Sequence, residues 1–337
     1  MKNDMKFYIT FIISAFVLLM ATFYQVSLLD ISNVGNRILV IVMGILITGV
    51  ALLLAVCFYK EKEFTVEKAT KVLLPIRFVL FFICMPIFKN HDEDHHWLRV
   101  YDITQGNLFT STEYGHIFAE NSTNYPAGKF PKAVLEVVDM QHSQSHELKD
   151  LLEVKIDEED IIYVAMPTTA IFAPLQYMPQ ATGAYLADLF TDRPLIIAYA
   201  ARFMNMLVCY TILYFAIKLI PFGKRIMLAT IAIPIAVEGF TSLSADGMTI
   251  SMSLLLIAYV LNLVFNKDIT KITKKHKITL ALISIVVALC KIVYLPLVGL
   301  ALLLPKDKFK SRKEQIATIC VILLIAIVIN LRLACKV

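Results

Sequence analysis

Charged residues are scarce in this sequence, and its long apolar runs are only briefly interrupted. Charged residues make up 18% of the chain and hydrophobic residues 58%, whereas soluble domains average about 25% charged and roughly 45–50% apolar residues. The apolar residues come in blocks of about 16 to 24, the length that crosses a hydrocarbon layer of roughly 30 Å as a helix. These features exclude soluble globular and disordered proteins, and they predict an all-α protein that crosses a membrane several times.

Cysteine is also rare, and none lies in the one long polar segment, residues 89–193. This segment therefore has no disulfide of its own, and no Cys-x-x-Cys or Cys/His metal spacing occurs in the sequence. Glycine-rich phosphate loops, the Gly-x-Ser-x-Gly nucleophile motif and the His-Glu-x-x-His zinc motif are absent as well. The known motifs of soluble enzymes therefore predict no cofactor and no metal.

Basic and acidic residues are separated along the chain. Residues 89–193 hold 7 Lys and Arg against 17 Asp and Glu, a formal charge of −10, while the rest of the chain carries +15. The basic excess lies mostly in short loops between apolar blocks, and such loops stay on the cytoplasmic side of a membrane. The charge pattern therefore indicates membrane topology, and it predicts no binding to nucleic acid.

We predict a polytopic helical bundle of about eight or nine spans. The apolar stretches are 7–29, 37–59, 72–88, 194–217, 226–240, 248–265, a doubled stretch at 278–304, and 316–334. Lys and Arg concentrate in the connections 60–71, 221–225, 267–277 and 305–313. If these connections and the N-terminus are cytoplasmic, the number of spans places residues 89–193 outside the cell membrane. The predicted parts are a two-span segment 1–71, a third span with the exoplasmic segment 72–193, and a multi-span segment 194–337.

The doubled stretch at 278–304 lies between two Lys-rich connections, so it must cross an even number of times. Its 27 residues give about 40 Å of helix, too long for one span and too short for two full ones. We predict a hairpin of two short helices with Lys291 and Tyr294 near the bend, and a single kinked span is the alternative. A lysine at such a tip is expected to face a polar cavity rather than lipid.

The exoplasmic segment is far longer than a connection requires. Residues 131–155 have the pattern of amphipathic helix around a polar middle. Residues 175–190 are apolar and aromatic, with no charge until Asp188. This second stretch is typical of a helix that lies on the outer membrane interface or dips into it.

A cluster of three acids and three histidines, Asn90-His91-Asp92-Glu93-Asp94-His95-His96-Trp97, directly follows the third predicted span. If a helix starts here, Asp92 and His96 share one face and Glu93 points elsewhere. Three interpretations are open. The cluster is a carboxylate general base at the outer face, a site for a divalent cation, or a solvated cap on the end of the span.

Arg202 lies inside the fourth predicted span, three residues before Asn205 and on the same face. A buried arginine is costly in a membrane, so it indicates a functional site. The alternatives are snorkelling to the membrane surface or an internal salt bridge, for instance with Glu238 or Asp246. Together with Lys291, Arg202 would offer two cations to a phosphate or pyrophosphate.

Two further stretches have two interpretations each. Asp246 falls in an Asp-Gly turn between two predicted spans, where a plain connection is the alternative to a site. Tyr177 lies between two prolines, Pro174 and Pro179. It either lines a groove or anchors the chain at the membrane interface.

Seven short motifs occur in the order found in one bacterial family of predicted membrane proteins. They are Asp92 to Trp97, Arg99 to Leu108, Pro174 to Gln180, Ala201 to Asn205, Pro221 to Arg225, Ser242 to Asp246, and Lys291 to Leu297. On these residues the chain resembles domain-of-unknown-function family 2142, which is considered part of the GT-C superfamily of membrane glycosyltransferases. Asp94 stands where the family has proline and Trp97 where it has phenylalanine, and the chain is expected to be C-terminally short for the family.

The resemblance implies a GT-C-like fold and a glycosyl transfer at the outer face of the membrane. The partners it implies are membrane lipid, a polyprenyl-phosphate-linked sugar as donor and a cell-envelope glycan as acceptor. Asp92 is then the general base, Glu93 the second candidate, and His96 a residue that shapes the site. The residues implied for binding the donor and its phosphate are Arg202, Asn205, Asp246, Lys291, Tyr294 and Tyr177. Metal use varies within the superfamily, so a divalent cation is not excluded.

Two alternatives to an active enzyme follow from the same residues. A transporter or flippase for a lipid-linked glycan would use the cations and the groove but would need no base. An inactive, truncated member of the family is the second alternative.

Overall fold

The computed structural model describes residues 65–90, 92–118, 126–143 and 146–334. The chain divides into two compact units, Met1–Leu73 and Leu74–Val337. The predicted spans 7–29 and 37–59 lie outside the described residues. The architecture below is that of the second unit.

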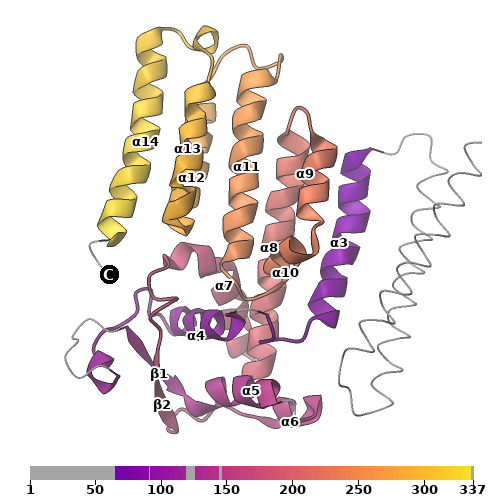
Figure 1. The fold of residues 1–337 in the computed structure, drawn as a ribbon, viewed down its shortest axis with the longest axis vertical. Coiled ribbons are helices and arrows are strands. Elements are labelled where there is room, and N and C mark those ends of the chain that lie inside the picture. The colour runs from indigo at the N-terminus through magenta and orange to yellow at the C-terminus, as the bar shows by residue number, and fades with distance from the viewer. Residues whose placement is uncertain (1–64, 91, 119–125, 144–145, 335–337) are drawn as a thin grey trace, which may run out of the picture. The chain divides into compact units, whose positions relative to one another are not determined.

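The long helices of this unit pack against one another in chain order (Figure 1). They are α8 (Pro194–Leu219), α11 (Asp246–Phe265), α12 (Lys274–Cys290) and α14 (Arg312–Ala334). Two helices of the described part, α8 and α11, are long and apolar enough to cross a membrane. The eight or nine spans predicted from the sequence therefore remain a prediction, while the mostly helical character is confirmed.

Two of the predicted spans differ in the structure. The predicted span 72–88 corresponds to α3 (Val66–Cys84), which begins and ends earlier. The predicted span 226–240 is two short helices, α9 (Lys224–Ile231) and α10 (Pro234–Thr241). The break falls at Pro234, which lacks a backbone N–H and begins the second helix.

The stretch after α12 turns back on itself at Lys291, as the hairpin prediction required. The Ile272 N–H donates to the Lys308 carbonyl oxygen at 2.8 Å, so the chain leaves and returns at the same end. The returning half is less regular than expected, because α13 (Leu295–Val298) lies between two short 3₁₀ turns. Lys291 itself has extended backbone and follows the last residue of α12.

Three of the basic connections, 221–225, 267–277 and 305–313, lie together at one end of these helices, the upper end in Figure 1. The Phe222 and Phe265 ring centroids are 5.2 Å apart. The Lys308 ammonium donates to the carbonyl oxygens of Leu263 at 2.7 Å and Asn266 at 3.0 Å, at the end of α11. The loops that the charge pattern assigned to one side of the membrane are therefore on one side of this unit.

The acidic segment lies at the opposite end and folds into its own layer of short elements (Figure 1). These are α4 (Glu93–Thr104), β1 (Ala127–Pro131), α5 (Lys132–Ser143), α6 (Leu148–Glu153), β2 (Ile161–Ala165) and α7 (Met178–Asp188). The predicted amphipathic stretch 131–155 is thus α5 and α6, and the stretch 175–190 is α7 with a preceding 3₁₀ turn.

The all-α prediction is wrong in one respect, because β1 and β2 form a two-stranded antiparallel sheet. Ala127 pairs with Ala165, and Pro131 with Ile161. The β2 sequence IIYVA is rich in β-branched and aromatic residues, which favour strands. It is short, and its partner strand is 30 residues away, so no hairpin signal connects the two.

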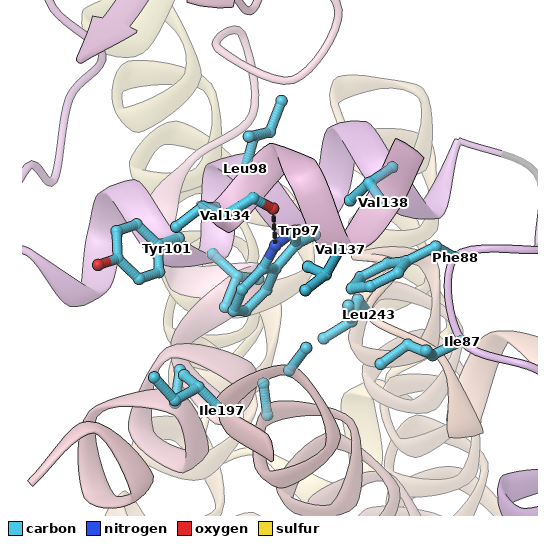
Figure 2. Close-up of a cluster of buried hydrophobic side chains, with 14 of the residues drawn as sticks. Ile87, Phe88, Trp97, Leu98, Tyr101, Val134, Val137, Val138, Ile197 and Leu243 are labelled. Atoms are coloured by element: carbon cyan, nitrogen blue, oxygen red, sulfur yellow. Dashed lines mark hydrogen bonds between the residues drawn. The ribbon is translucent and has the colours of Figure 1, made fainter. Parts of the chain in front are cut away.

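A hydrophobic core fills the space between α4, α5 and α8, and Trp97 lies at its centre (Figure 2). The Trp97 indole is fully buried, and its Nε1–H donates to the Val134 carbonyl oxygen at 3.1 Å. Phe88 and Tyr101 pack against its ring at centroid distances of 6.1 and 5.7 Å. The acidic segment is therefore a packed layer that can hold a site at the ends of the helices.

Close packing of α7 on α8 gives the first prediction. A Cβ atom on Gly183 would lie 2.4 Å from the Ala200 carbonyl oxygen and 2.7 Å from Met204 Cβ. Gly183→Ala should therefore push α7 off α8 and destabilise the protein by about 1–3 kcal/mol, measured as a lower melting temperature in detergent. Gly299→Ala is the matched control, because no atom lies within 4 Å of its added Cβ. Equal melting temperatures for the two variants would contradict the close packing.

Candidate functional site

The turn that connects α10 to α11, residues 241–246, is held by side chains from two other helices. The Arg202 Nε–H of α8 donates to the Thr241 carbonyl oxygen at 2.6 Å. The Asn205 amide, one turn further along α8, donates to the Ser242 carbonyl oxygen at 2.8 Å. From α7, the Gln180 amide donates to the Ser244 carbonyl oxygen at 3.1 Å. We call residues 241–246 the clamped turn.

Glu93, at the start of α4, completes this clamp from the other side. Its carboxylate accepts the Leu243 N–H and the Phe88 N–H, each at 2.9 Å. The Glu93 Oε1 atom is also 3.4 Å from the Arg202 Nε, and both side chains are 0% exposed. Arg202 donates further to the Met85 carbonyl oxygen at 2.9 Å. The buried pair thus joins the end of α3, the start of α4 and the clamped turn.

The structure places Arg202 differently from what the sequence suggested. Arg202 was expected to face an outer cavity or to pair with Glu238 or Asp246. It is enclosed instead, and its ionic partner is Glu93. The physical reason is that a charge removed from water needs an opposite charge and hydrogen bonds close by, and Glu93 together with two carbonyl oxygens supplies them.

A second group of polar side chains contacts the clamped turn at Ser244. His96 Nδ1 and the Tyr177 hydroxyl are 2.7 Å apart, and His96 Nε2 and the Ser244 hydroxyl are 3.4 Å apart. The His96 ring also stacks on Phe172, with 6.3 Å between centroids and 17° between planes. Burial is the main cause that lowers the pKa of His96 to about 4. The imidazole is therefore neutral at pH 7, with one nitrogen as donor and the other as acceptor.

Asp246 and Lys291 form an ion pair beside this histidine. Their side chains are 47% and 26% exposed, so both charged groups can reach a ligand. The Lys291 ammonium also lies over the Phe172 ring, 5.0 Å from its centroid. Lys291 is placed by the end of α12 and Asp246 by the clamped turn, so two separate elements meet here.

Asp92 is exposed and precedes α4 with a left-handed backbone, φ 57°. Aspartate tolerates this conformation better than most residues, and such positions concentrate at functional sites. Asp92, Asp246 and Lys291 are all among the charges that act on the pKa of His96, after its burial. Asp92 lies one helical turn before His96, whose backbone N–H donates to the Asp92 carbonyl oxygen at 3.0 Å.

The structure thus divides the predicted site residues into two groups. Those around the Asp246–Lys291 pair are the accessible Asp92, Asp246 and Lys291 and the buried His96 and Tyr177. Those inside the clamp are Glu93, Arg202 and Asn205. Tyr294 is half-buried in the 3₁₀ turn after Lys291 and packs on the second hydrophobic core, between α11, α12 and α14. The catalytic and binding roles of all these residues remain predictions.

Sequence reasoning missed Gln180, Ser244 and Phe172. Gln180 was within a quoted motif but received no role, although a glutamine in an apolar helix signals a buried hydrogen bond. Ser244 could have been inferred from the polar Ser-Leu-Ser turn before Asp246. Phe172 carries no signal in the sequence, because its importance comes only from the His96 ring and the Lys291 ammonium that pack on it.

Metal binding gains no support from the described residues. Within them, no group of three or more His, Cys, Asp or Glu side chains is arranged to hold a metal ion. The alternative of a divalent cation at Asp92 and His96 therefore has no third protein ligand among the residues that the structure describes.

Apolar helices of membrane-spanning length, basic connections at one end and a polar cluster at the other define the class of integral membrane proteins. Residues 75–336 match the family model described as "Predicted membrane protein (DUF2142)", and the chain belongs to this family. The resemblance to family 2142 stated from the motifs is confirmed, while membership of the GT-C superfamily remains a prediction. No curated protein and no solved structure matches the chain.

The buried ion pair gives the second prediction. Glu93→Gln and Arg202→Gln should each destabilise the protein by roughly 3–5 kcal/mol, because each leaves the other charge buried without its partner. The double variant should lose less stability than the sum of the two single losses, and the difference should be about 1–3 kcal/mol. Unfolding in detergent with added denaturant measures all four proteins.

The exposed pair Lys155–Asp192, with 3.0 Å between the charged atoms, is the control for this cycle. Replacing either member should leave stability almost unchanged, because surface ion pairs contribute little. Strictly additive losses at Glu93 and Arg202 would show that the two side chains do not interact.

The buried histidine gives the third prediction. The folded protein holds His96 neutral down to about pH 4, whereas an unfolded histidine takes up a proton near pH 6.5. The contribution of neutral His96 to the stability of the folded protein is therefore fully present above about pH 6.5, and it declines as the pH falls towards 4. His96→Gln should flatten this part of the melting-temperature profile, and replacement of the exposed His116 should not. Identical profiles for the two variants would contradict a neutral buried imidazole.

Proposed function

We propose that the protein is a membrane glycosyltransferase of the GT-C type. It transfers a sugar from a polyprenyl-phosphate donor to a cell-envelope acceptor at the outer face of the membrane. One observation carries this proposal: an accessible ammonium and a carboxylate from separate elements, Lys291 and Asp246, pair beside the neutral His96 at one end of the bundle. The exposed Asp92 precedes the helix that carries this histidine.

The length of α11 indicates at which depth of the membrane this cluster lies. Its 20 residues extend over about 30 Å, which equals the thickness of the hydrocarbon layer. Asp246 begins the helix, and the basic connections lie at its other end. With α11 as a span and the basic connections in the cytoplasm, the Asp246–Lys291 pair is level with the outer lipid headgroups. The phosphate of a lipid-linked donor lies at this level too.

In the proposed reaction Asp92 accepts the proton of an acceptor hydroxyl. The hydroxyl oxygen forms a bond to the anomeric carbon of the sugar, and the bond from that carbon to the phosphate oxygen breaks. The polyprenyl phosphate leaves with the electron pair, and Lys291 stabilises the negative charge that grows on it. Asp246 holds Lys291 in place before the donor arrives.

The remaining residues act through position rather than through contact with the donor. Neutral His96 and Tyr177 form the wall behind Asp246 and keep their hydrogen bonds within the protein. Glu93, Arg202 and Asn205 fix the clamped turn from which Asp246 projects. Asp92 alone is the base, because both carboxylate oxygens of Glu93 are buried and already accept hydrogen bonds.

The fourth prediction tests the base. The gene is deleted in its host, and the composition of the surface polysaccharide is measured by mass spectrometry after complementation. Wild type should restore one missing sugar, and Asp92→Asn should not. Asp94→Asn removes the same charge two residues away and should restore the sugar, because Asp94 caps the neighbouring His95 N–H instead.

Other outcomes of this experiment decide between the alternatives. Rescue by Asp92→Asn at equal expression would exclude a carboxylate base at this position and favour a flippase for a lipid-linked glycan. A flippase should still fail with Lys291→Met, because it needs the cation for the phosphate. Deletion without any change in the glycan would refute the proposed acceptor.

A further inference from the structure

The small sheet of the acidic layer has an unpaired edge on β2 (Figure 1). The Lys132 N–H donates to the Asp160 carbonyl oxygen at 2.8 Å, directly beyond one end of the sheet. Because the hydrogen bonds of an antiparallel ladder join every second residue pair, this bond fixes which residues of β2 face β1. The even-numbered residues bond to β1, and three residues direct their N–H and C=O groups away from it: Ile161, Tyr163 and Ala165.

These outward groups have no hydrogen-bond partner among the residues that the structure describes. Natural proteins protect the edge of a sheet with lysine, with proline or with a covering segment, since an open edge pairs readily with another extended chain. The outer edge of β1 has all three protections. Lys129 and Pro131 lie on it, and the Ala127 N–H donates to the Ser111 carbonyl oxygen at 3.1 Å.

The outer edge of β2 lacks each of these protections within the described part of the chain. Its sequence, IIYVA, has no proline and no charge, and it is rich in the β-branched and aromatic residues that favour strands. The two edges of one small sheet therefore differ in kind. The edge of β1 is closed, and the edge of β2 is open to a further strand.

A groove of about 480 Å³ runs beside this open edge, between β2 and α5. Leu135, Met140 and Ile162 supply its apolar lining. Among the described residues, Ile162 is the one member of the sheet that lines the groove, and no residue of β1 does. The groove therefore lies on the β2 side of the sheet, where the side chains of an added strand would enter it.

The charge around the edge decides which extended chain fits. Glu136 and Asp139 are exposed and line the groove, and four exposed acids in a row, residues 157–160, directly precede β2. The groove also has Lys132 in its wall, but this lysine has Asp160 as its ionic partner at 4.0 Å. A second copy of the chain would bring the same acids to the edge, whereas a basic segment is attracted to it.

We propose that β2 binds an extended, basic segment of a partner protein as the third strand of this sheet. The backbone of the segment exchanges hydrogen bonds with the outward N–H and C=O groups of β2. Alternate side chains of the segment face the groove. There the alkyl stems of lysine or arginine cover Leu135 and Met140, and their charged ends reach Glu136 and Asp139. The surface is separate from the Asp246–Lys291 pair, so this inference does not depend on the proposed function.

The fifth prediction tests the pairing with a defined probe. A short peptide of alternating lysine and valine, blocked at both ends and labelled with fluorescein, is titrated with the full-length protein in phosphatidylcholine nanodiscs. Fluorescence anisotropy should show saturable binding that weakens as the salt concentration rises. The same peptide with glutamate in place of lysine should not bind. The lysine peptide with methyl groups on its backbone nitrogens keeps its charges but has no backbone N–H, so it should bind at least about 10-fold more weakly.

Variants of Tyr163 test the edge from the side of the protein. Tyr163→Pro removes an outward N–H and leaves the ladder to β1 intact, a position where strands accept proline. It should weaken binding about 5–10-fold relative to Tyr163→Val, which removes the same ring but keeps the N–H. The melting temperatures of these two variants should be similar. Val164→Pro removes a ladder N–H instead and should lower the melting temperature.

Charge variants test the choice of a basic segment. Glu136→Gln combined with Asp139→Asn should weaken binding of the lysine peptide about 3–10-fold, the value of two exposed ion pairs. Asp268→Asn removes an exposed charge in the basic connection 267–277 and should leave the affinity unchanged.

Several results would overturn the inference. Equal affinity for the methylated and unmethylated peptides, or for Tyr163→Pro and Tyr163→Val, would reduce the surface to a patch of negative charge. Absence of saturable binding, or equal binding of the glutamate peptide, would refute a basic partner. A wild-type dimer in detergent, measured by light scattering and dissociated by Tyr163→Pro, would show that a second copy of the chain occupies the edge instead.

Discussion

The buried ion pair between Glu93 and Arg202 is the interaction on which the rest of the site depends. Both charges are removed from water, so each needs the other, and further hydrogen bonds to both come from backbone groups. Those backbone groups belong to the end of α3 and to the clamped turn. The requirement to neutralise one arginine therefore sets the position of the turn that carries Asp246.

This constraint explains why adjacent acids have different surroundings. Asp92 and Glu93 are neighbours, but the start of α4 directs one outward and the other into the core. The outward acid lies one helical turn before His96, beside which Asp246 and Lys291 pair. A fixed interior and an accessible surface cluster are thus built from one short stretch of chain. The acidic layer adds an open strand edge of its own at β2.

Much of the fold could be predicted from local patterns. The reversal at Lys291 followed from two Lys-rich connections on either side of a stretch too short for two spans, and the structure has it. The amphipathic pattern of residues 131–155 predicted α5 and α6 with their polar middle. The pairing of β1 with β2 could not be predicted, because it joins two short strands that are far apart in the chain. Pro234 was visible in the sequence, and the break it causes between α9 and α10 was overlooked.

The sequence by itself determined the class of protein, the family and the separation of basic connections from the acidic segment, because hydrophobicity and charge act along the chain. It also marked Asp92, His96, Arg202, Asp246 and Lys291 as residues to explain. Only the tertiary structure decided that Arg202 pairs with Glu93 and that Lys291 pairs with Asp246. Glu93 meets the Leu243 N–H across 150 positions of sequence. Such a contact depends on how α4, α8 and the clamped turn pack together, and no local pattern records that packing.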